Sequence, residues 1–346
     1  MKVSRMKILV TGNQGYIGTH ATAHLVKQGY EVVGMDSGFY KDCNLSVITS
    51  EVFTNQKDIR DVEIQDFTDV DAVVHLAALS NDPLGELDSS LTLDINYKAA
   101  VRVAELSKAA GVSRFVFVSS QSMYGISIST EELDEIDSTK NPQTAYAESK
   151  WRAEQEIMGM RDSSFSPVAL RPSTVFGWSS RLRSDIIFNN LLLTGLEKGR
   201  IEVHSDGTPW RPVVHIHDIS LAIQTCIEID QDKISGKAFN VGVLDGNFTV
   251  KEIAEAAQIC LGGIPVAYKT ENIVDPRSYK VSFKRMFSEL GFQAQVDLQT
   301  GGNELVLEAK KLLASNVELL GRKSNRLLQI KYLLENGLID DSLRSK

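Results

Sequence analysis

The chain opens with a strand, a glycine-rich turn and a helix, and few folds accommodate this order. The strand candidate is KILVT, the turn is GNQGYIG and the helical stretch is THATAHLVKQG, so Gly12, Gly15 and Gly18 lie between the strand and the helix. Glycines let the backbone approach a diphosphate closely, and the positive end of the helix stabilises the diphosphate charge. The sequence therefore predicts a dinucleotide-binding turn.

Strand and helix patterns continue to alternate after this unit. Strand candidates follow in YEVVGMD, EVFTNQKD, DAVVHLAA, RFVFVSS and SPVALRP, and polar or helical sequence separates them. Continuous apolar strands that alternate with helices indicate a parallel sheet covered on both faces. We therefore expect an α/β fold built on a Rossmann-type doubly wound parallel sheet.

An acidic residue, Asp36, ends the second strand candidate, and Ser37 rather than an arginine follows it. A carboxylate at this position can accept hydrogen bonds from both ribose hydroxyls of an adenosine group, and it repels a 2'-phosphate. Asp36 therefore favours NAD over NADP as cofactor. The alternative is an aspartate that only caps a turn.

The alternation of strands and helices weakens beyond Pro172, which indicates a second unit. We expect residues 1–175 to form an NAD-binding Rossmann domain and residues 176–346 to form mainly a smaller C-terminal α/β substrate-binding lobe. Segments around residues 212–240 are expected to pack back on the first domain. The stretches IEVHSD and RPVVHI are expected to pair as strands.

Composition excludes several classes of protein. A chain of 346 residues, of which 42% are hydrophobic, can bury a sizeable core. A formal net charge of -8 without a Lys/Arg cluster argues against a nucleic-acid partner. We see no signal peptide and no spanning segment, so we expect a cytoplasmic protein without a membrane partner. Three widely spaced cysteines predict neither a disulfide framework nor a zinc site.

The stretch YAESK places Tyr146 and Lys150 four residues apart at the start of a helical run. Residues i and i+4 lie on one side of a helix, so both side chains can act on one bound molecule. Oxidation of an alcohol removes a proton from the hydroxyl as well as hydride from the carbon, and a phenolate can accept that proton. An unperturbed tyrosine titrates near about pH 10, and a neighbouring ammonium lowers this value. The spacing also fits two neighbours on a solvated helix face.

His215 and His217 alternate along a presumed strand, which raises the question of a metal site. Asp218 would point to the other face of a continuing strand, and two histidines rarely form a metal site unaided. We expect no metal.

An ordered set of motifs resembles the extended short-chain dehydrogenase/reductases of the nucleotide-sugar epimerase and dehydratase group. The set comprises TGNQGYIG, Asp36, KDIRD, HLAA, Asn96, VSSQSMYG, YAESK and LRPSTVFG, and it covers nearly the whole chain. These motifs are specific as an ordered set, although few are specific singly.

The resemblance implies an NAD-dependent enzyme with Ser120, Tyr146 and Lys150 as its catalytic residues. Ser120 would bind the substrate oxygen, Tyr146 would be the base, and Lys150 would activate it and hold the nicotinamide ribose. A serine that satisfies only local backbone stays an alternative for Ser120. Asp58 and Ile59 would flank the adenine. The implied cofactor-binding residues are Gly12, Gly15, Tyr16, Ile17, Gly18, Asp36, Asp58, Ile59, Leu76, Ala77, Ala78, Asn96 (at the nicotinamide side), Tyr146 and Lys150.

For the substrate, the resemblance implies a nucleotide sugar whose diphosphate is held by an asparagine and two arginines. The implied substrate-binding residues are Ser120, Gln121, Tyr146, Thr174, Asn190, Arg211 and Arg277. The 4,6-dehydratases of this group carry Asp and Glu directly after the catalytic hydroxyl, where this chain has Gln121 and Ser122. Elimination of water is therefore disfavoured. Arg181 and Arg183 are expected to contact either substrate phosphate or only solvent.

These residues leave three functions open. The first is an NAD-dependent nucleotide-sugar epimerase, at C4, that passes through a keto sugar and keeps NAD bound. The second is a net nucleotide-sugar 4-dehydrogenase or 4-keto reductase in deoxysugar or polysaccharide biosynthesis, and the third is a non-catalytic protein that senses NAD. The resemblance also implies a homodimer, with the helix that carries YAESK as a candidate contact.

Overall fold

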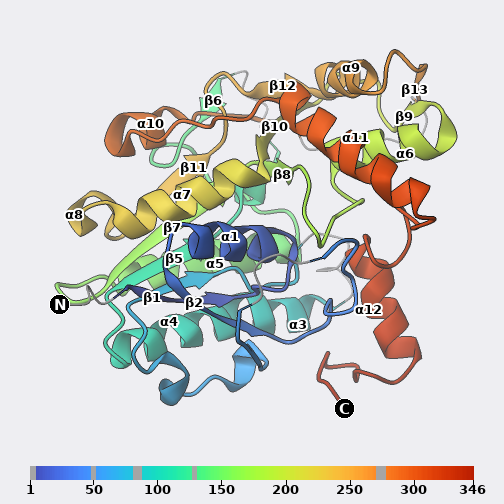
Figure 1. Ribbon diagram of the computed structural model, residues 1–346. Helices are drawn as coiled ribbons and strands as arrows, with labels where there is room; N and C mark the ends of the chain where they lie inside the picture. The colour runs from blue at the N-terminus through green and yellow to red at the C-terminus, as the bar shows by residue number, and fades with distance from the viewer. Residues whose placement is uncertain (1–4, 48–51, 81–87, 127–130, 270–277) are drawn as a thin grey trace.

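The computed structural model describes residues 5–47, 52–80, 88–126, 131–269 and 278–346. Its main feature is a seven-stranded sheet in the order β3-β2-β1-β4-β5-β7-β11, with every strand parallel to its neighbours (Figure 1). The strands are β1 (Lys7–Thr11), β2 (Glu31–Asp36), β3 (Thr54–Gln56), β4 (Ala72–His75), β5 (Arg114–Val118), β7 (Ser166–Pro172) and β11 (Lys237–Val241). The order runs outward from β1 in both directions, so the predicted Rossmann-type doubly wound sheet is confirmed.

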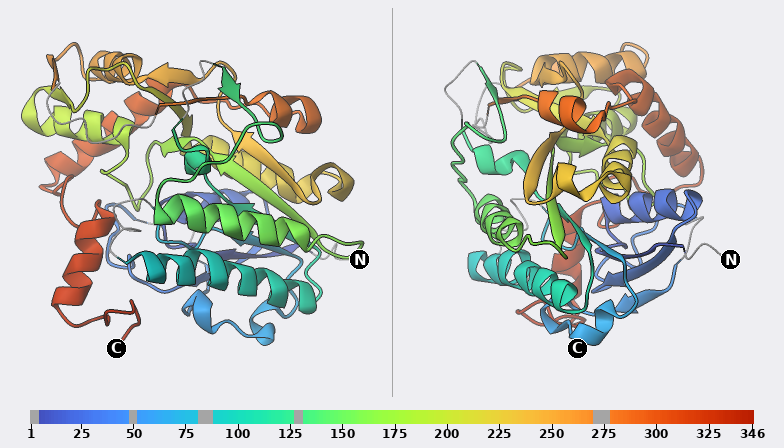
Figure 2. Two further views of the ribbon diagram at one scale, coloured as in Figure 1. Left: turned by 180° about the vertical axis from the view of Figure 1, so that it is seen from behind. Right: turned by 90° about the vertical axis from the view of Figure 1, so that its left-hand side faces the viewer.

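Helices cover both faces of this sheet, which explains why its strands are apolar throughout. Ile8 and Val10 of β1 are buried with residues of α1 and α7, whereas Leu9 is buried with residues of α4 and α5 on the opposite face. The right-hand view of Figure 2 shows the sheet between these two helix layers. A strand buried on both faces needs apolar residues at every position, because successive side chains point to opposite faces. The helices are α1 (Tyr16–Lys27), α4 (Ala100–Ala109), α5 (Ala145–Gly159) and α7 (Ile216–Glu228).

Helix α7 begins at Ile216, directly after strand β10, and this start corrects the interpretation of the two histidines. His215 is the N-cap of the helix, and its Nδ1 accepts a hydrogen bond from the His217 amide at 3.3 Å. His217 and Asp218 therefore lie in a helix, and the assumption of a continuing strand is wrong. Within the described ranges, no group of three or more His, Cys, Asp or Glu side chains is placed to hold a metal ion.

A second lobe lies above the sheet in Figure 1 and has its own core, in which Phe188, Leu192 and Leu305 are fully buried. Strand β10 pairs with β8 and β12, and β9 pairs with β13. The predicted pairing of IEVHSD with RPVVHI is therefore wrong, because β8 and β12 already occupy the two edges of β10. The lobe elements are α6 (Ile187–Lys198), α9 (Val250–Cys260), α11 (Leu298–Ala314), β8 (Thr174–Phe176), β9 (Ile201–Val203), β10 (Trp210–His215), β12 (Asn247–Thr249) and β13 (Val266–Tyr268).

Shorter elements connect these layers. They are α3 (Ser89–Leu93), the π-helix η3 (Asp94–Ala99), the 3-10 turns η1 (Ile59–Asp61), η2 (Ile64–Phe67) and η4 (Gln121–Tyr124), α8 (Gln231–Ile234), α10 (Lys284–Leu290), and the paired strands β6 (Glu132–Leu133) and β14 (Lys280–Val281). No helix in the described part of the chain combines the length and the apolar content that a membrane crossing requires.

The end of the chain forms an arm, residues 325–346, that leaves the second lobe and returns to the sheet. Figure 1 shows helix α12 (Arg326–Glu335) below α11, with the C-terminus beyond it. Ile330 and Leu343 are buried in the same hydrophobic cluster as Leu9 of β1. This C-terminal arm is therefore part of the core of the sheet layer.

Candidate functional site

The carboxyl ends of the parallel strands border a cleft of about 770 Å³ between the sheet and the second lobe. Ligands of doubly wound folds bind at this edge, because loops from several strands converge there. Most residues predicted from the sequence line this one cleft. They are Gly12, Gly15, Tyr16, Ile17, Gly18, Asp36, Asp58, Ile59, Leu76, Ala77, Ala78, Ser120, Gln121, Tyr146, Lys150, Thr174, Asn190 and Arg211.

The turn between β1 and α1 requires glycine at two positions. Gly12 has a φ of +73°, and a Cβ there would lie 2.7 Å from the backbone nitrogen of Ala77. A Cβ at Gly18 would collide with the carbonyl oxygen of Gly12. The turn is therefore tight against the loop after β4, and the first turn of α1 lines the cleft, where the amides of a helix N-terminus can bind a diphosphate.

Asp36 lies at the end of β2 and is buried. Its Oδ2 accepts a hydrogen bond from the Gln14 amide at 3.0 Å, and its Oδ1 accepts one from the Gly38 amide at 2.9 Å. Burial raises the pKa of this carboxyl, and the two amides counteract the effect. Each carboxylate oxygen has a second lone pair, so the amides fix the group and leave acceptors for ribose hydroxyls.

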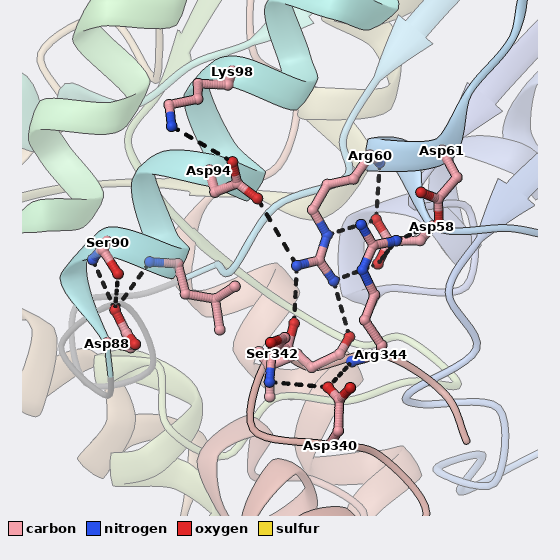
Figure 3. Close-up of polar contacts among 12 residues, drawn as sticks. Asp58, Arg60, Asp61, Asp88, Ser90, Asp94, Lys98, Asp340, Ser342 and Arg344 are labelled. Atoms are coloured by element: carbon pink, nitrogen blue, oxygen red, sulfur yellow. Dashed lines mark hydrogen bonds and ion pairs between the residues drawn. The ribbon is translucent and has the colours of Figure 1, made fainter.

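The C-terminal arm fastens the turn that carries Asp58 and Ile59. Both oxygens of Asp58 accept hydrogen bonds from the Arg60 guanidinium, at 3.0 and 2.6 Å. Arg60 also donates to the carbonyl oxygens of Ser342 and Leu343, at 2.9 and 3.1 Å. Figure 3 shows this network, which crosses from the turn after β3 to the end of the chain. Burial alone would raise the pKa of Asp58, but Arg60 more than offsets it, and the pKa lies below its usual value.

Arg344 strengthens the same junction. Its Nη1 forms an ion pair with Asp61 and lies 3.6 Å from Oδ2 of Asp58. Arg60 is far less exposed than Arg344, at 7% against 34% of the side chain. The buried arginine is therefore expected to hold the arm more firmly than the exposed one.

Two further arginines contact Tyr40, which lines the cleft. Arg181 donates to Asn44 Oδ1 and to the carbonyl oxygens of Gln14 and Tyr40, so it joins the glycine turn to the loop after β2. Arg326 of the C-terminal arm lies over the Tyr40 ring, 4.5 Å from its centroid, and is 1% exposed. Its Nη1 has no hydrogen-bond partner among the described residues. Its Nη2 donates to the Arg181 carbonyl oxygen at 2.6 Å, so the buried cation is held by a neutral acceptor and keeps its charge, which fits an anionic cofactor.

Ser120 lies directly after β5 and is the N-cap of η4. Its Oγ accepts a hydrogen bond from the Ser122 amide at 3.1 Å and contacts the Ser122 hydroxyl at 3.1 Å. Ser120 therefore does cap local backbone, and it also lines the cleft. The two interpretations do not exclude each other, because a hydroxyl has two lone pairs and a rotatable hydrogen.

Tyr146 lies in the first turn of α5 and Lys150 one turn later, so both are on the side of the helix that faces the cleft. Lys150 is 3% exposed, its Nζ donates to the Val118 carbonyl oxygen at 2.7 Å, and it lies 4.7 Å from the Phe117 ring centroid. Burial lowers the pKa of Lys150 to about 7, and the charge of Glu154 counteracts only part of the shift.

Asn96 differs from the other predicted residues because it lies beside the cleft wall and not among its lining residues. It belongs to the π-helix η3, accepts a hydrogen bond from the Leu79 amide at 2.7 Å and donates to the Leu79 carbonyl oxygen at 3.1 Å. Leu79 lines the cleft, so Asn96 positions the loop after β4. Irregular π turns are frequent at functional sites.

Thr174, Asn190 and Arg211 approach the cleft from the second lobe, on β8, α6 and β10. Asn190 Nδ2 donates to the Ser184 carbonyl oxygen at 2.9 Å. The other predicted arginine, Arg277, lies outside the residues that the structure describes.

The structure places Arg181 and Arg183 in different surroundings. Arg181 contacts protein acceptors as described above. Arg183 forms two hydrogen bonds with Asp185, of 2.9 and 2.8 Å, and lines the cleft. Neither guanidinium group is therefore an ordinary solvent-exposed arginine.

Sequence reasoning missed part of the cleft wall. The missed residues share no local motif. They come from the loop after β2, the junction of β7 and β8, the segment before α6, β9 and the residue after it, the residue before β14, and the C-terminal arm. They include Phe39, Tyr40, Ser173, Asp185, Glu202, His204, Tyr279, Asn325, Arg326 and Leu327. A weak signal existed for Arg326, because this charged residue directly precedes the apolar pair Leu327 and Leu328.

Comparison with known proteins places this geometry in a family. The profile of the NAD dependent epimerase/dehydratase family matches residues 8–242. UDP-glucuronate 4-epimerase 4 of Arabidopsis thaliana is 27% identical over 332 residues, covering 86% of this chain and 74% of that protein. UDP-glucose 4-epimerase of Bacillus subtilis (strain 168) is 26% identical over 352 residues, covering 90% and 98%.

A solved structure agrees with these sequence relatives. The chain of MoeE5 in complex with UDP-glucuronic acid and NAD is 27% identical and has a TM-score of 0.76, covering 88% of this chain and 99% of that chain. The profile match runs from the first strand of the sheet to its last and spans more than half of the residues. The predicted cofactor and the predicted enzymatic character are confirmed. This chain therefore belongs to the NAD dependent epimerase/dehydratase family and uses NAD.

Proposed function

We propose that this protein is an NAD-dependent nucleotide-diphosphate-sugar epimerase that inverts C4 through a transient 4-keto sugar. The observation that carries the proposal is the shared cleft, in which Ser120, Tyr146 and Lys150 stand at one edge of the sheet with the glycine turn. Positions 121 and 122 hold Gln121 and Ser122, so a carboxylic acid and a carboxylate for loss of water are missing at this place in the sequence.

The cleft residues fit the cofactor. The tight turn at Gly12 and Gly18 leaves room for a diphosphate where side chains would intrude, Asp36 presents acceptors for ribose hydroxyls, and Arg326 brings a buried positive charge. NAD, when bound, supplies a hydride acceptor that can return the hydride to the same carbon.

The side chains divide the proton chemistry between them. Tyr146 accepts the proton of the sugar 4-hydroxyl and later returns it, Ser120 binds the sugar oxygen, and the protonated form of Lys150 stabilises the phenolate. Arg211 and Asn190, from the lobe, hold the diphosphate far enough from the reacting carbon for the sugar to present either face. Inversion then needs rotation of the sugar only, while the nucleotide stays in place.

The C-terminal arm favours epimerisation over net oxidation. An epimerase regenerates its cofactor in each cycle and has no need to release it, whereas a net dehydrogenase must exchange it. Arg60 ties the turn with Asp58 to the arm, and Gln329 Nε2 donates to the Phe39 carbonyl oxygen at 2.9 Å. Both segments beside the predicted adenosine site are therefore held closed.

The experiment starts with protein purified without added cofactor. Part of it is denatured and assayed for released NAD, and the rest is incubated with UDP-, GDP-, CDP- and dTDP-sugars while NADH absorbance and sugar stereochemistry are followed. We expect co-purified NAD, an epimerised sugar and no accumulating NADH. A keto sugar that forms only with stoichiometric added NAD would identify a net dehydrogenase instead.

Tyr146→Phe tests the assigned base. We expect kcat to fall by at least roughly a hundredfold, the usual contribution of a positioned acid or base. Tyr97→Phe is the matched control, because Tyr97 bonds Glu156 at 2.8 Å and lies outside the cleft lining. Near-normal turnover in Tyr146→Phe would contradict the assignment.

A further inference from the structure

Glu154 continues the line of Tyr146 and Lys150 along α5, four residues beyond Lys150. Side chains four apart lie on one side of a helix, with their Cβ atoms roughly 5–6 Å apart. Tyr146 and Lys150 line the cleft, whereas Glu154 lies outside the cleft lining and is 2% exposed. The helix therefore carries a buried carboxylate one turn behind the buried ammonium of Lys150.

Arg171 of β7 fixes the Glu154 carboxylate. Its Nε donates to both carboxylate oxygens at 3.1 Å, and its Nη2 lies 2.5 Å from Oε1 in an ion pair. Arg171 is itself held in place, because its Nη1 donates to the Tyr124 hydroxyl at 3.0 Å and its carbonyl oxygen accepts a hydrogen bond from Gln121 Nε2 at 3.0 Å. Removing two charges from water offsets much of their attraction, so a gain in stability alone does not explain this buried pair.

The negative charge of Glu154 acts on Lys150. Burial lowers the pKa of Lys150, and the Glu154 carboxylate counteracts this effect. The direct partner of the Lys150 Nζ is a neutral acceptor, the Val118 carbonyl oxygen at 2.7 Å. Because the surroundings are buried, water screens the attraction between the carboxylate and the ammonium only weakly.

Other charged or titratable groups face this side of α5 from the elements packed around it. Burial lowers the pKa of His75 to about 3 and raises the pKa of Tyr124 to about 12, so both are neutral near pH 8. Arg183 is positive and forms an ion pair with Asp185. The groups come from β4 (His75), β7 (Arg171), η4 (Tyr124), the segment after β6 (Glu135 and Lys140) and the segment before α6 (Arg183 and Asp185). Neither His75, Tyr124 nor Arg183 can replace the negative charge of Glu154 at Lys150.

We propose that Glu154 is a positioning residue for the proton chemistry, and that its carboxylate, fixed by Arg171, keeps Lys150 protonated. Only the protonated lysine can stabilise the Tyr146 phenolate. The inference takes the role of Lys150 from the proposed function and adds the group that sustains this role.

Two substitutions separate the charge of Glu154 from its shape. Glu154→Gln keeps the length of the side chain and an acceptor for Arg171 but removes the charge, whereas Glu154→Asp keeps the charge and shortens the side chain. The Lys150 amine is titrated by NMR in full-length protein that is purified with its NAD and isotope-labelled at the lysine ε carbons. Its signal is assigned by its loss in Lys150→Met. All these proteins also carry Tyr146→Phe, so that the lysine titrates without coupling to the phenol.

The titration midpoint of Lys150 is expected to depend on the charge at position 154. It should fall by at least about one pH unit in Glu154→Gln, a tenfold change in the acid dissociation constant, and by less than about half as much in Glu154→Asp. Glu156→Gln is the matched control, because Glu156 is exposed on the same helix and bonds Tyr97, and it should leave the midpoint unchanged. If Glu154→Gln fails to fold with Arg171 unpaired, Glu154→Gln combined with Arg171→Met replaces it, and the midpoint should fall there too.

Turnover gives a second readout in proteins that retain Tyr146. For a sugar that reacts in the panel, the alkaline limb of the pH profile of kcat should move to lower pH in Glu154→Gln and stay in place in Glu154→Asp, because this limb reports loss of the Lys150 proton. An unchanged midpoint in Glu154→Gln, or equal shifts in the Gln and Asp variants, would overturn the inference and leave the proposed function standing. A panel without turnover would contradict the proposed function, and the titration midpoint alone would then decide the inference.

Discussion

Replacement of Lys150 by methionine is expected to stabilise the NAD-free protein while it removes a catalytic group. The Lys150 ammonium is almost completely buried, and its pKa falls from 10.5 to about 7. Each pH unit between the assay pH and 10.5 corresponds to about 1.4 kcal/mol, so near about pH 8 deprotonation on folding costs about 3 kcal/mol. Loss of the hydrogen bond to the Val118 carbonyl oxygen destabilises the variant by about 1 kcal/mol and offsets part of this gain. We therefore expect a net gain in stability of about 2 kcal/mol.

The pH dependence of this gain has a defined sign. The native pKa lies below the unfolded value, so between pH 7 and 10.5 the unfolded chain binds a proton that the folded protein does not. Wild-type stability relative to Lys150→Met therefore rises with pH across this window. The wild type has its lowest free energy of unfolding relative to Lys150→Met below about pH 7. The contribution of the buried lysine to this difference disappears above the pKa of the unfolded chain.

Urea unfolding of NAD-stripped protein at several pH values checks this reasoning. The wild type and Lys150→Met are compared with Lys98→Met, a control in which the replaced side chain is 70% exposed. The difference in free energy of unfolding between the wild type and Lys150→Met should shrink with rising pH, whereas the control should follow the wild type. Parallel curves for the wild type and Lys150→Met, or a strongly destabilised Lys150→Met, would refute the argument from burial.

Two further predictions concern the cofactor site. Asp36→Ala should reduce the preference for NAD over NADP at least about tenfold, because it removes a charged acceptor of the ribose hydroxyls and a repulsive charge; equilibrium binding of both cofactors measures this, and an unchanged ratio would place the discrimination elsewhere. Arg60→Ala should raise the NAD dissociation rate about tenfold, and Arg344→Ala less than about threefold, because only the first guanidinium is buried among its acceptors. Stopped-flow release of NAD compares the two variants, and equal effects would contradict the burial argument.

Local pattern was sufficient for the sheet and for the residues at its strand ends. The runs KILVT, DAVVHLAA and RFVFVSS are apolar on both faces of their strands. Burial on both faces requires such continuous apolar runs, so the sequence pattern predicts these strands. The turn from Gly12 to Gly18 could also be predicted from the sequence. A Cβ atom at Gly12 or Gly18 would collide with backbone atoms, so both positions require glycine.

The remaining features depend on contacts between distant parts of the chain. The pairing of β10 could not be read from the pattern, because three strands compete for two edges of similar composition. The helix at His217 looked like a strand because β-branched residues precede it and the cap is a histidine. The contacts of Arg60 with Ser342 and Leu343 join residues more than 280 positions apart, and short-range periodicity carries no information about them.

The C-terminal arm also has a consequence for how the protein matures. A ribosome adds about 5–20 residues per second, and domains form from the N-terminal end as the chain emerges. The strands that end at or just before Gly12, Asp36 and Ser120 are all synthesised before Arg326, so these strands can pair while the adenosine end of the cleft still lacks a wall. A messenger that stops early, just before α12, would yield every catalytic side chain in a protein unable to retain its cofactor. Residues 325–346 therefore complete the adenosine end of the cleft only after the catalytic residues have been synthesised.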